Sequence, residues 1–143
     1  MKTIALAGLL ALSATFAAAE GLNHKVAVHV DQNDPAVMNM ALNNVENLIS
    51  YYTEQGDTVT VEVVTYGPGL TMLIDGQSPV ADRIATMTME HEGLTFDACA
   101  NTLAGMEKKA GQKIPLMSEA TVVPSGVVQL ITLQEDGYAY VRP

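Results

Sequence analysis

The chain is predicted to fold as an α/β domain, a three-layer α/β/α sandwich built on a mostly parallel five-stranded sheet. Three observations support this prediction. Short runs rich in valine and threonine alternate with longer segments that carry apolar residues at helical spacing. Glycine or proline marks most of the boundaries, and no linker interrupts the alternation. Helices between strands at this spacing imply right-handed crossovers, which make neighbouring strands parallel and place helices on both faces of the sheet.

The first two strands and the helix between them are expected over residues 25–66. The run Lys25–Asp31 is apolar and β-branched, as in a buried strand, and Thr58–Tyr66 has the same character. Between them, Asp34-Pro35 supplies an N-cap followed by proline at the first helical position. Gly56 is expected to end this helix. Its apolar stripe is predicted to comprise Val37, Ala41, Val45, Leu48, Ile49 and Tyr52.

The second half of the chain repeats the alternation. A Gly67-Pro68-Gly69 turn is followed by a short apolar segment, and a helix is expected to start at Ser78-Pro79 and to stop at Gly93. Asn101 or Thr102 is the expected N-cap of the next helix, which runs through Lys109. The remaining elements are a third strand at Leu94–Ala98, a fourth at Ala120–Val123, a helix at Gly126–Asp136 and a last strand at Tyr138–Val141.

The first nineteen residues have the pattern of a secretory signal peptide. Lys2 precedes an apolar run over 4–16, and the small residues Ala17-Ala18-Ala19 follow it. The run is too short to span a bilayer, which needs roughly 20 apolar residues. No cysteine follows it to accept a lipid. We therefore expect cleavage after Ala19, a periplasmic location, and one folded domain over residues 20–143 that does not insert into the membrane.

Charge and motif content exclude several classes of function. Loss of Lys2 with the signal changes the formal net charge from −9 to −10, which opposes binding to nucleic acid or to an anionic membrane. The glycine turn lacks the third glycine and the lysine of a phosphate loop. His24, His29 and His91 lack the spacing of zinc ligands. Neither a metal nor another cofactor is expected.

Chemically distinctive residues follow the predicted strands at the point where each one ends. In an open parallel sheet, the binding crevice lies outside the carboxyl ends of the strands. The sequence therefore predicts a site at this edge. Its candidate residues are His29 and Asp31 after the first strand, Gly67 and Gly69 after the second, and Cys99 and Asn101 after the third.

These residues leave two interpretations open. The N-terminus of a helix after Cys99 would stabilise a thiolate, whereas the nearby Asp97 opposes it, and free cysteine is often simply buried. His29 and Asp31 share one face of a strand, so the imidazole could serve ligand contact or proton transfer. A histidine whose hydrogen bonds are satisfied within the fold is the alternative.

Four motifs resemble the DsrE/DsrF-like sulfur-relay family, in particular its small single-domain branch of largely unknown function. The motifs are VVTYGPGL at 63–70, FDACANT at 96–102, VPSGV at 123–127 and QEDGYAYVRP at 134–143. The resemblance covers nearly all of residues 20–143. It implies a five-stranded parallel sheet, a homo-oligomer such as a trimer or hexamer, and a cysteine after the third strand that carries sulfur as a persulfide. Cys99 matches that position. The characterised relay proteins are cytoplasmic, and in this respect the chain differs from them.

The expected function is therefore that of an exported carrier or binder of a small sulfur species, acting through Cys99. Its partners would be a sulfur-containing small molecule or a sulfur-acceptor protein. The competing hypothesis is a non-catalytic, homo-oligomeric module that binds a small ligand and in which Cys99 is structural. A true enzyme is the weakest of the three, because the sequence displays no complete acid–base or nucleophile set.

Overall fold

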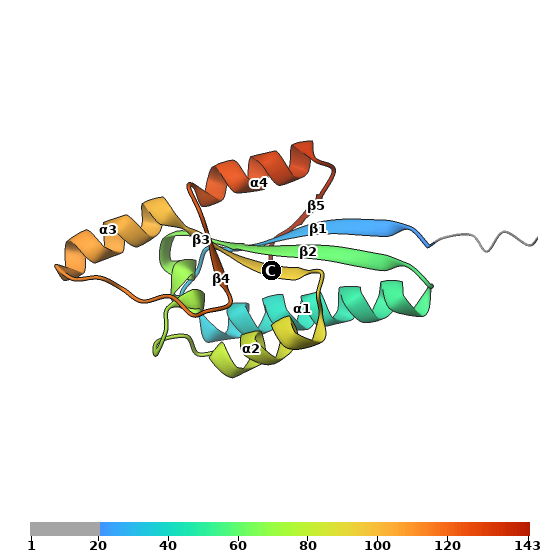
Figure 1. Ribbon diagram of the computed structural model, residues 1–143, viewed down its shortest axis with the longest axis horizontal. Helices are drawn as coiled ribbons and strands as arrows, with labels where there is room; N and C mark the ends of the chain where they lie inside the picture. Colours follow the sequence, from blue (N-terminus) through green and yellow to red (C-terminus); the bar gives the residue numbers. More distant parts are fainter. Residues whose placement is uncertain (1–20) are drawn as a thin grey trace, which may run out of the picture.

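A computed structural model describes residues 21–143 and confirms the predicted α/β fold, with five parallel strands in the order β4-β3-β2-β1-β5 within that range. The predicted signal peptide, residues 1–19, lies outside the described residues. Figure 1 shows the arrangement. The elements are β1 (Asn23–Val30), α1 (Pro35–Glu54), β2 (Thr58–Thr65), the 3-10 helix η1 (Gly67–Leu73), α2 (Ala81–Glu90), β3 (Leu94–Cys99), α3 (Ala100–Ala110), β4 (Ala120–Val123), α4 (Gly126–Glu135) and β5 (Ala139–Val141).

The direction in which the chain crosses the sheet decides which face each helix covers. From β1 to β3 every crossover moves the same way, so right-handed connections place α1 and α2 on one face. The chain then returns across the sheet, from β4 to β5 beside β1, and this reversed step places α4 on the opposite face (Figure 1). The result is the expected three-layer sandwich.

Apolar packing is concentrated on the face that α1 and α2 cover. Alternate residues of the central strands, such as Val28, Val63 and Phe96, pack there with Met38 and Ile84 in one large cluster. The face under α4 holds a much smaller cluster, which consists of Ala27, Val64, Leu130 and Leu133. Across the described residues, no helix combines the length and the apolar character that crossing a bilayer requires.

The helix starts were predicted with mixed success. Asp34 caps α1 as expected, because its Oδ1 accepts a hydrogen bond of 2.8 Å from the backbone N–H of Ala36. The N-cap of α3 was predicted wrongly: it is Cys99, and Asn101 and Thr102 already lie in the helix. The buried stripe of α1 is also rotated from the predicted one. It includes Met38 and Leu42 with Ala41 and Val45.

The glycine turn after β2 depends on a close approach between two backbones. Gly67 has a φ of +54°, the left-handed region that glycine adopts without strain. Gly69 is buried, and a Cβ at this position would collide with the carbonyl oxygen of Val30 and lie 2.8 Å from the Cα of Asp31. Glycine at 69 therefore allows η1 to pack directly on the end of β1.

We expect Gly69→Ala to lower the free energy of unfolding by about 3 kcal/mol, which is the upper end of the usual cost of overpacking. The cost is high because the new Cβ collides with backbone atoms, which cannot rotate away as a side chain could. Gly105→Ala is the matched control. Gly105 lies inside α3 with open space around its Cα, so alanine should stabilise the helix by about 0.5–1 kcal/mol. Urea unfolding of both variants measures the difference, and equal stabilities would contradict the proposed close approach.

Candidate thiolate site

Cys99 lies where β3 ends and α3 begins, and its sulfur lies beside the N-termini of two helices. The backbone N–H of Thr102 donates to Sγ at 3.4 Å. The Thr102 hydroxyl and the backbone N–H groups of Asn101 and Gly126 also act on the sulfur. Gly126 is the first residue of α4, which follows the neighbouring strand β4. The sulfur is thus directed at the positive ends of both α3 and α4.

The hydrogen bonds outweigh burial in setting the ionisation of Cys99. Burial by itself raises the pKa of the thiol, since an anion loses its hydration there. The Thr102 hydroxyl, followed by the three backbone N–H groups, lowers the pKa by more, so the net pKa is below the ordinary value. This arrangement favours the thiolate, the form of cysteine that attacks other sulfur atoms.

The sulfur is nearly covered by the start of α4. Cys99 is 5% exposed. A Cβ on Gly126 would lie 2.9 Å from the side chain of Tyr66 and 3.3 Å from the Cβ of Cys99, so only glycine lets the helix approach this closely. Tyr66 in turn follows β2 and lies half-buried beside Gly126. Access to Cys99 therefore depends on the position of the first turn of α4.

His29 belongs to an aromatic group next to this site. Its Nδ1 lies 2.7 Å from the hydroxyl of Tyr140, and its ring packs against that of Tyr66 with centroids 4.6 Å apart. Burial lowers the pKa of His29; Asp31 raises it and Arg142 lowers it, both more weakly. The environment therefore favours the neutral imidazole. Its Nε2 is buried and has no hydrogen-bond partner among residues 21–143.

Asp31 is joined to the end of the chain. Arg142 donates from Nη2 to both carboxylate oxygens of Asp31, at 3.0 and 2.9 Å. This pair ties the segment after β1 to the segment after β5. Burial, and after it the charge of Asp31, raises the pKa of Tyr66 above that of an ordinary phenol.

Gly67 and Asn101 contribute to a separate pocket. A cavity of about 410 Å³ lies between η1 and α3, and its lining includes Gly67, Asn101, Thr71, Asn33 and Lys109. Thr102 separates this pocket from the sulfur: its Oγ1 accepts a 2.9 Å hydrogen bond from the Gly67 N–H while its own N–H donates to Cys99. The predicted residues therefore fall into two neighbouring groups. His29 and Asp31 lie on the Tyr66 side of the sulfur, and Gly67 and Asn101 line the pocket.

Asp97 lies under α4 in contact with a second carboxyl group. It precedes Cys99 by two residues, on the same face of β3. Burial, followed by contact with Glu62, raises the pKa of Asp97 to about 7. Glu62 itself accepts 3.0 Å hydrogen bonds from Gln129 of α4 and from the Tyr138 hydroxyl. The expected opposition between Asp97 and the thiolate is thereby reduced, because Asp97 holds a proton up to near neutral pH.

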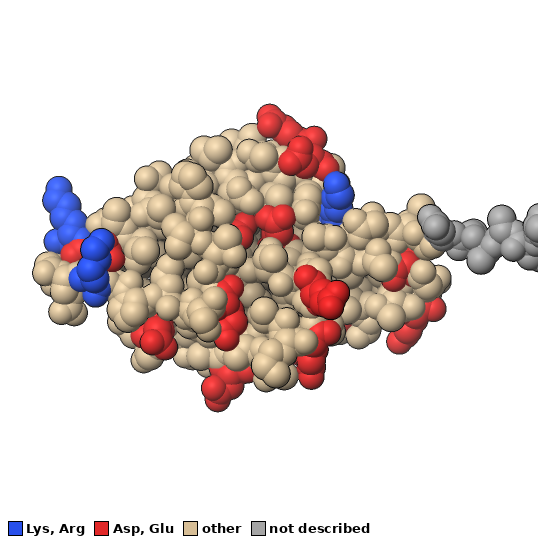
Figure 2. Space-filling model, viewed as in Figure 1, with Lys and Arg blue, Asp and Glu red and all other residues tan. Residues whose placement is uncertain are grey.

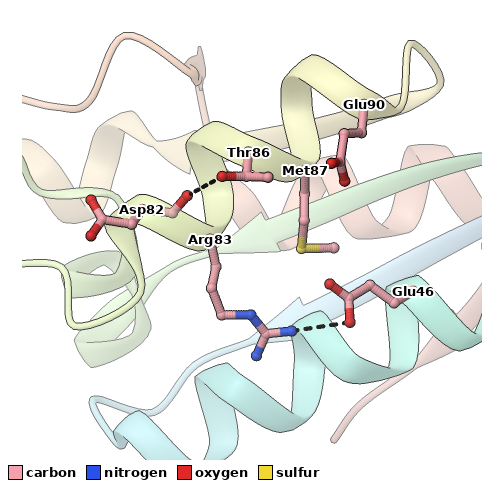
Figure 3. A pocket seen from close by; sticks show the side chains of 6 residues that line it. All are labelled: Glu46, Asp82, Arg83, Thr86, Met87 and Glu90. Atoms are coloured by element: carbon pink, nitrogen blue, oxygen red, sulfur yellow. Dashed lines mark hydrogen bonds and ion pairs between the residues drawn. The ribbon is translucent and has the colours of Figure 1, made fainter.

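A further pocket lies on the other side of the sheet. This cavity of about 220 Å³ is formed by α1 and α2, where Arg83 bridges to Glu46 at 3.2 Å beside Asp82 and Glu90 (Figure 3). It contains none of the predicted site residues. Within residues 21–143, no group of three histidine, cysteine, aspartate or glutamate side chains is placed to hold a metal ion.

Several residues of the site were missed by sequence reasoning. Tyr66, Thr102, Gly126, Tyr140 and Arg142 all lie within the four motifs that carry the family resemblance, but none was assigned a role at the sulfur or at His29. The VPSGV and YVRP motifs were the sequence features that could have pointed to Gly126, Tyr140 and Arg142 as site residues. Their contribution became clear only when the strand order placed β4 beside β3 and β5 beside β1.

Fold and site together define an α/β protein in which a cysteine is held at two helix N-termini, at the carboxyl edge of a parallel sheet. No family model and no curated protein matches the chain. A solved structure does: the protein of unknown function MTH1491 from Methanobacterium thermoautotrophicum is 30% identical, with a TM-score of 0.70 over 84% of this chain and 99% of that one. The chain therefore belongs to the same family as MTH1491.

We expect Thr102→Val to shift the alkylation of Cys99 to higher pH. Iodoacetamide reacts with the thiolate, so its rate rises as pH passes through the pKa of the thiol. Valine removes the hydroxyl that lowers this pKa most, and the midpoint should move upward. Thr102→Ser keeps the hydroxyl and serves as the control, with a midpoint near that of the unmodified protein. Coincident pH profiles for all three proteins would show that the hydroxyl does not act on the sulfur.

Proposed function

We propose that the protein is an exported sulfur carrier of the DsrE/DsrF-like kind, in which Cys99 accepts a sulfur atom as a persulfide. The observation that supports this most directly is the convergence of donors from α3 and α4 on Sγ. A cysteine that served only to fill space would not need polar groups from two helices that lower its pKa. The same donors would stabilise the terminal persulfide anion, which also carries its charge on sulfur.

The transfer step needs no cofactor. The Cys99 thiolate attacks the sulfane sulfur of a donor such as thiosulfate or a polysulfide, and a new S–S bond forms at Sγ. The S–S bond within the donor breaks, and its electron pair leaves with sulfite or with the shortened polysulfide. The product is a Cys99 persulfide anion. A second thiolate, on an acceptor protein or a small molecule, then takes the terminal sulfur and regenerates the Cys99 thiolate.

The second candidate is a non-catalytic module that binds a small ligand in the pocket of Gly67 and Asn101. Two observations favour it. The pocket is separate from the sulfur, and Cys99 is only 5% exposed. In this alternative, Cys99 is structural: it caps α3 and fixes the start of α4. The ligand would be small and polar, and Lys109 and the Asn101 amide would bind it.

Export and self-association belong to the same proposal. The segment 17–19 supports cleavage after Ala19 and action in the periplasm. A homo-oligomer, trimer or hexamer, is supported by the resemblance and by a mean hydropathy of +0.18 in so short a chain. Sulfur would then pass between this oligomer and a separate donor or acceptor.

Persulfide formation is tested by intact mass. Reduced protein is incubated anaerobically with polysulfide or thiosulfate, and a carrier should gain about 32 Da, the mass of one sulfur atom, which a reductant removes. Cys99→Ser should gain nothing. A Cys99 that stays unmodified and resists iodoacetamide in the folded state, in dilute as well as in concentrated protein, would sink the carrier proposal and leave the ligand-binding module in its place.

Export is tested on protein produced in an exporting host. N-terminal sequencing should find Glu20 as the first residue, because the small residues 17–19 form the cleavage site. Ala19→Pro should block cleavage and leave a precursor heavier by the mass of the signal. An unmodified chain that keeps Met1 would contradict export through this signal.

A further inference from the structure

Helix α4 is apolar on two opposite faces. Its inner face packs on the sheet through Leu130 and Leu133. Its outer face exposes Val127, Val128 and Ile131, which are 52, 56 and 51% exposed. A surface helix of a monomeric domain normally has a polar outer face, and a helix that is apolar all round is normally buried. The outer face of α4 is therefore an exposed apolar surface of the kind that interfaces with other proteins use.

Charge points to a second copy of the same chain as the partner. From Gly126 to Gln134 the helix has no charged residue, and Glu135 and Asp136 follow at its C-terminal end. Figure 2 shows this distribution: uncharged atoms lie along α4 and red atoms only at its C-terminal end. Two copies of the cleaved chain, each with a net charge of −10 after loss of Lys2, repel each other wherever acidic groups meet, so an uncharged face is where they can approach.

The ends of the helix also set the orientation. The Ser125 side chain makes no capping hydrogen bond within the described part of the chain, so no side chain neutralises the positive end of α4, where the Gly126 N–H faces Cys99. When two α4 helices pack antiparallel, the acidic end of each, at Glu135 and Asp136, lies beside the positive end of the other. With Val128 of one copy facing Ile131 of the other, Ile131 of the first also faces Val128 of the second, which is the reciprocal contact of a two-fold interface. Such a contact suits a hexamer built from two trimers, which needs two-fold contacts, and not a trimer alone.

The same helix covers the sulfur. Gly126 packs against Cys99 and Tyr66, and the contacts that hold α4 down are a small apolar cluster and the hydrogen bond from Gln129 to Glu62. A helix held by so few contacts opens readily from its end. A second copy on its outer face would add apolar burial and hold the first turn over Cys99.

We propose that two copies of the chain associate through the outer faces of α4 and that this contact controls access to Cys99. The inference deepens the proposed sulfur carrier by giving its site a means of regulation: the associated form protects Cys99, and separation of the copies opens it to a sulfur donor or acceptor. It rests on the reactivity of Cys99, and its test does not depend on sulfur transfer.

The test compares assembly with alkylation. Val128→Lys and Ile131→Lys place charge in the middle of the contact, so sedimentation should show a smaller species, and iodoacetamide should modify Cys99 severalfold faster. Met89→Lys is the matched control, because Met89 is 85% exposed on α2, which lies on the other side of the sheet. It should change neither property. Circular dichroism and urea unfolding verify that each variant is folded.

Dilution of the unmodified protein makes the same test without a substitution. As the copies separate, the alkylation rate of Cys99 should rise in parallel.

Glu135→Lys should weaken assembly, since lysine would oppose the positive end of the neighbouring helix. The proposed α4 interface would be wrong if the protein were monomeric at every concentration. It would also be wrong if Val128→Lys and Ile131→Lys left the assembly intact. If the copies separate and Cys99 is not alkylated faster, the interface does not control access to the sulfur. If Glu135→Lys does not weaken assembly, the two helices are not antiparallel. A failure of persulfide formation would change none of these readouts.

Discussion

The structure depends on the unequal distribution of apolar packing between the two faces of one sheet. The face under α1 and α2 holds the large cluster around Phe96 and Met38, and the free energy that stabilises the domain comes mainly from there. With a single cysteine, the chain cannot add an internal disulfide. Because packing on that face supplies most of the stability, the opposite face can hold His29, Asp97 and Cys99 where apolar side chains would otherwise pack. A helix seated over polar groups is held weakly, and α4 is in that position.

The thiolate site follows from topology as much as from local sequence. Strands β3 and β4 are neighbours, and Cys99 pairs in register with Val123. Each strand leads into a helix within three residues, so two helix N-termini begin side by side at the carboxyl edge of the sheet. One sulfur can accept from both. The same edge receives Arg142 because the chain returns to β1 with its last strand, which brings that guanidinium to Asp31.

Sequence reasoning predicted the elements well because their signals are local: valine-rich strands, the Asp34-Pro35 cap, and glycines at the ends of helices. It also predicted the edge of the sheet at which Cys99, His29 and Asp31 lie. What it missed depends on contacts between distant segments. Cysteine is not a usual N-cap, so the start of α3 was placed at Asn101 or Thr102. That Gly126 packs on Cys99, and that Thr102 separates the sulfur from the Gly67 pocket, requires knowledge of which strands are neighbours.

The carboxyl pair under α4 gives the domain an uncommon response to acid. Asp97, with a pKa of about 7, keeps its proton in the folded state at mildly acidic pH, whereas in an unfolded chain an aspartate has lost it above about pH 4. Unfolding in this range therefore releases a proton, and the folded state gains stability as pH falls from about 7 towards 4. Above neutral pH, the two carboxylates repel each other beneath Gln129, which belongs to α4. Alkaline conditions should thus loosen this helix before the main core is affected.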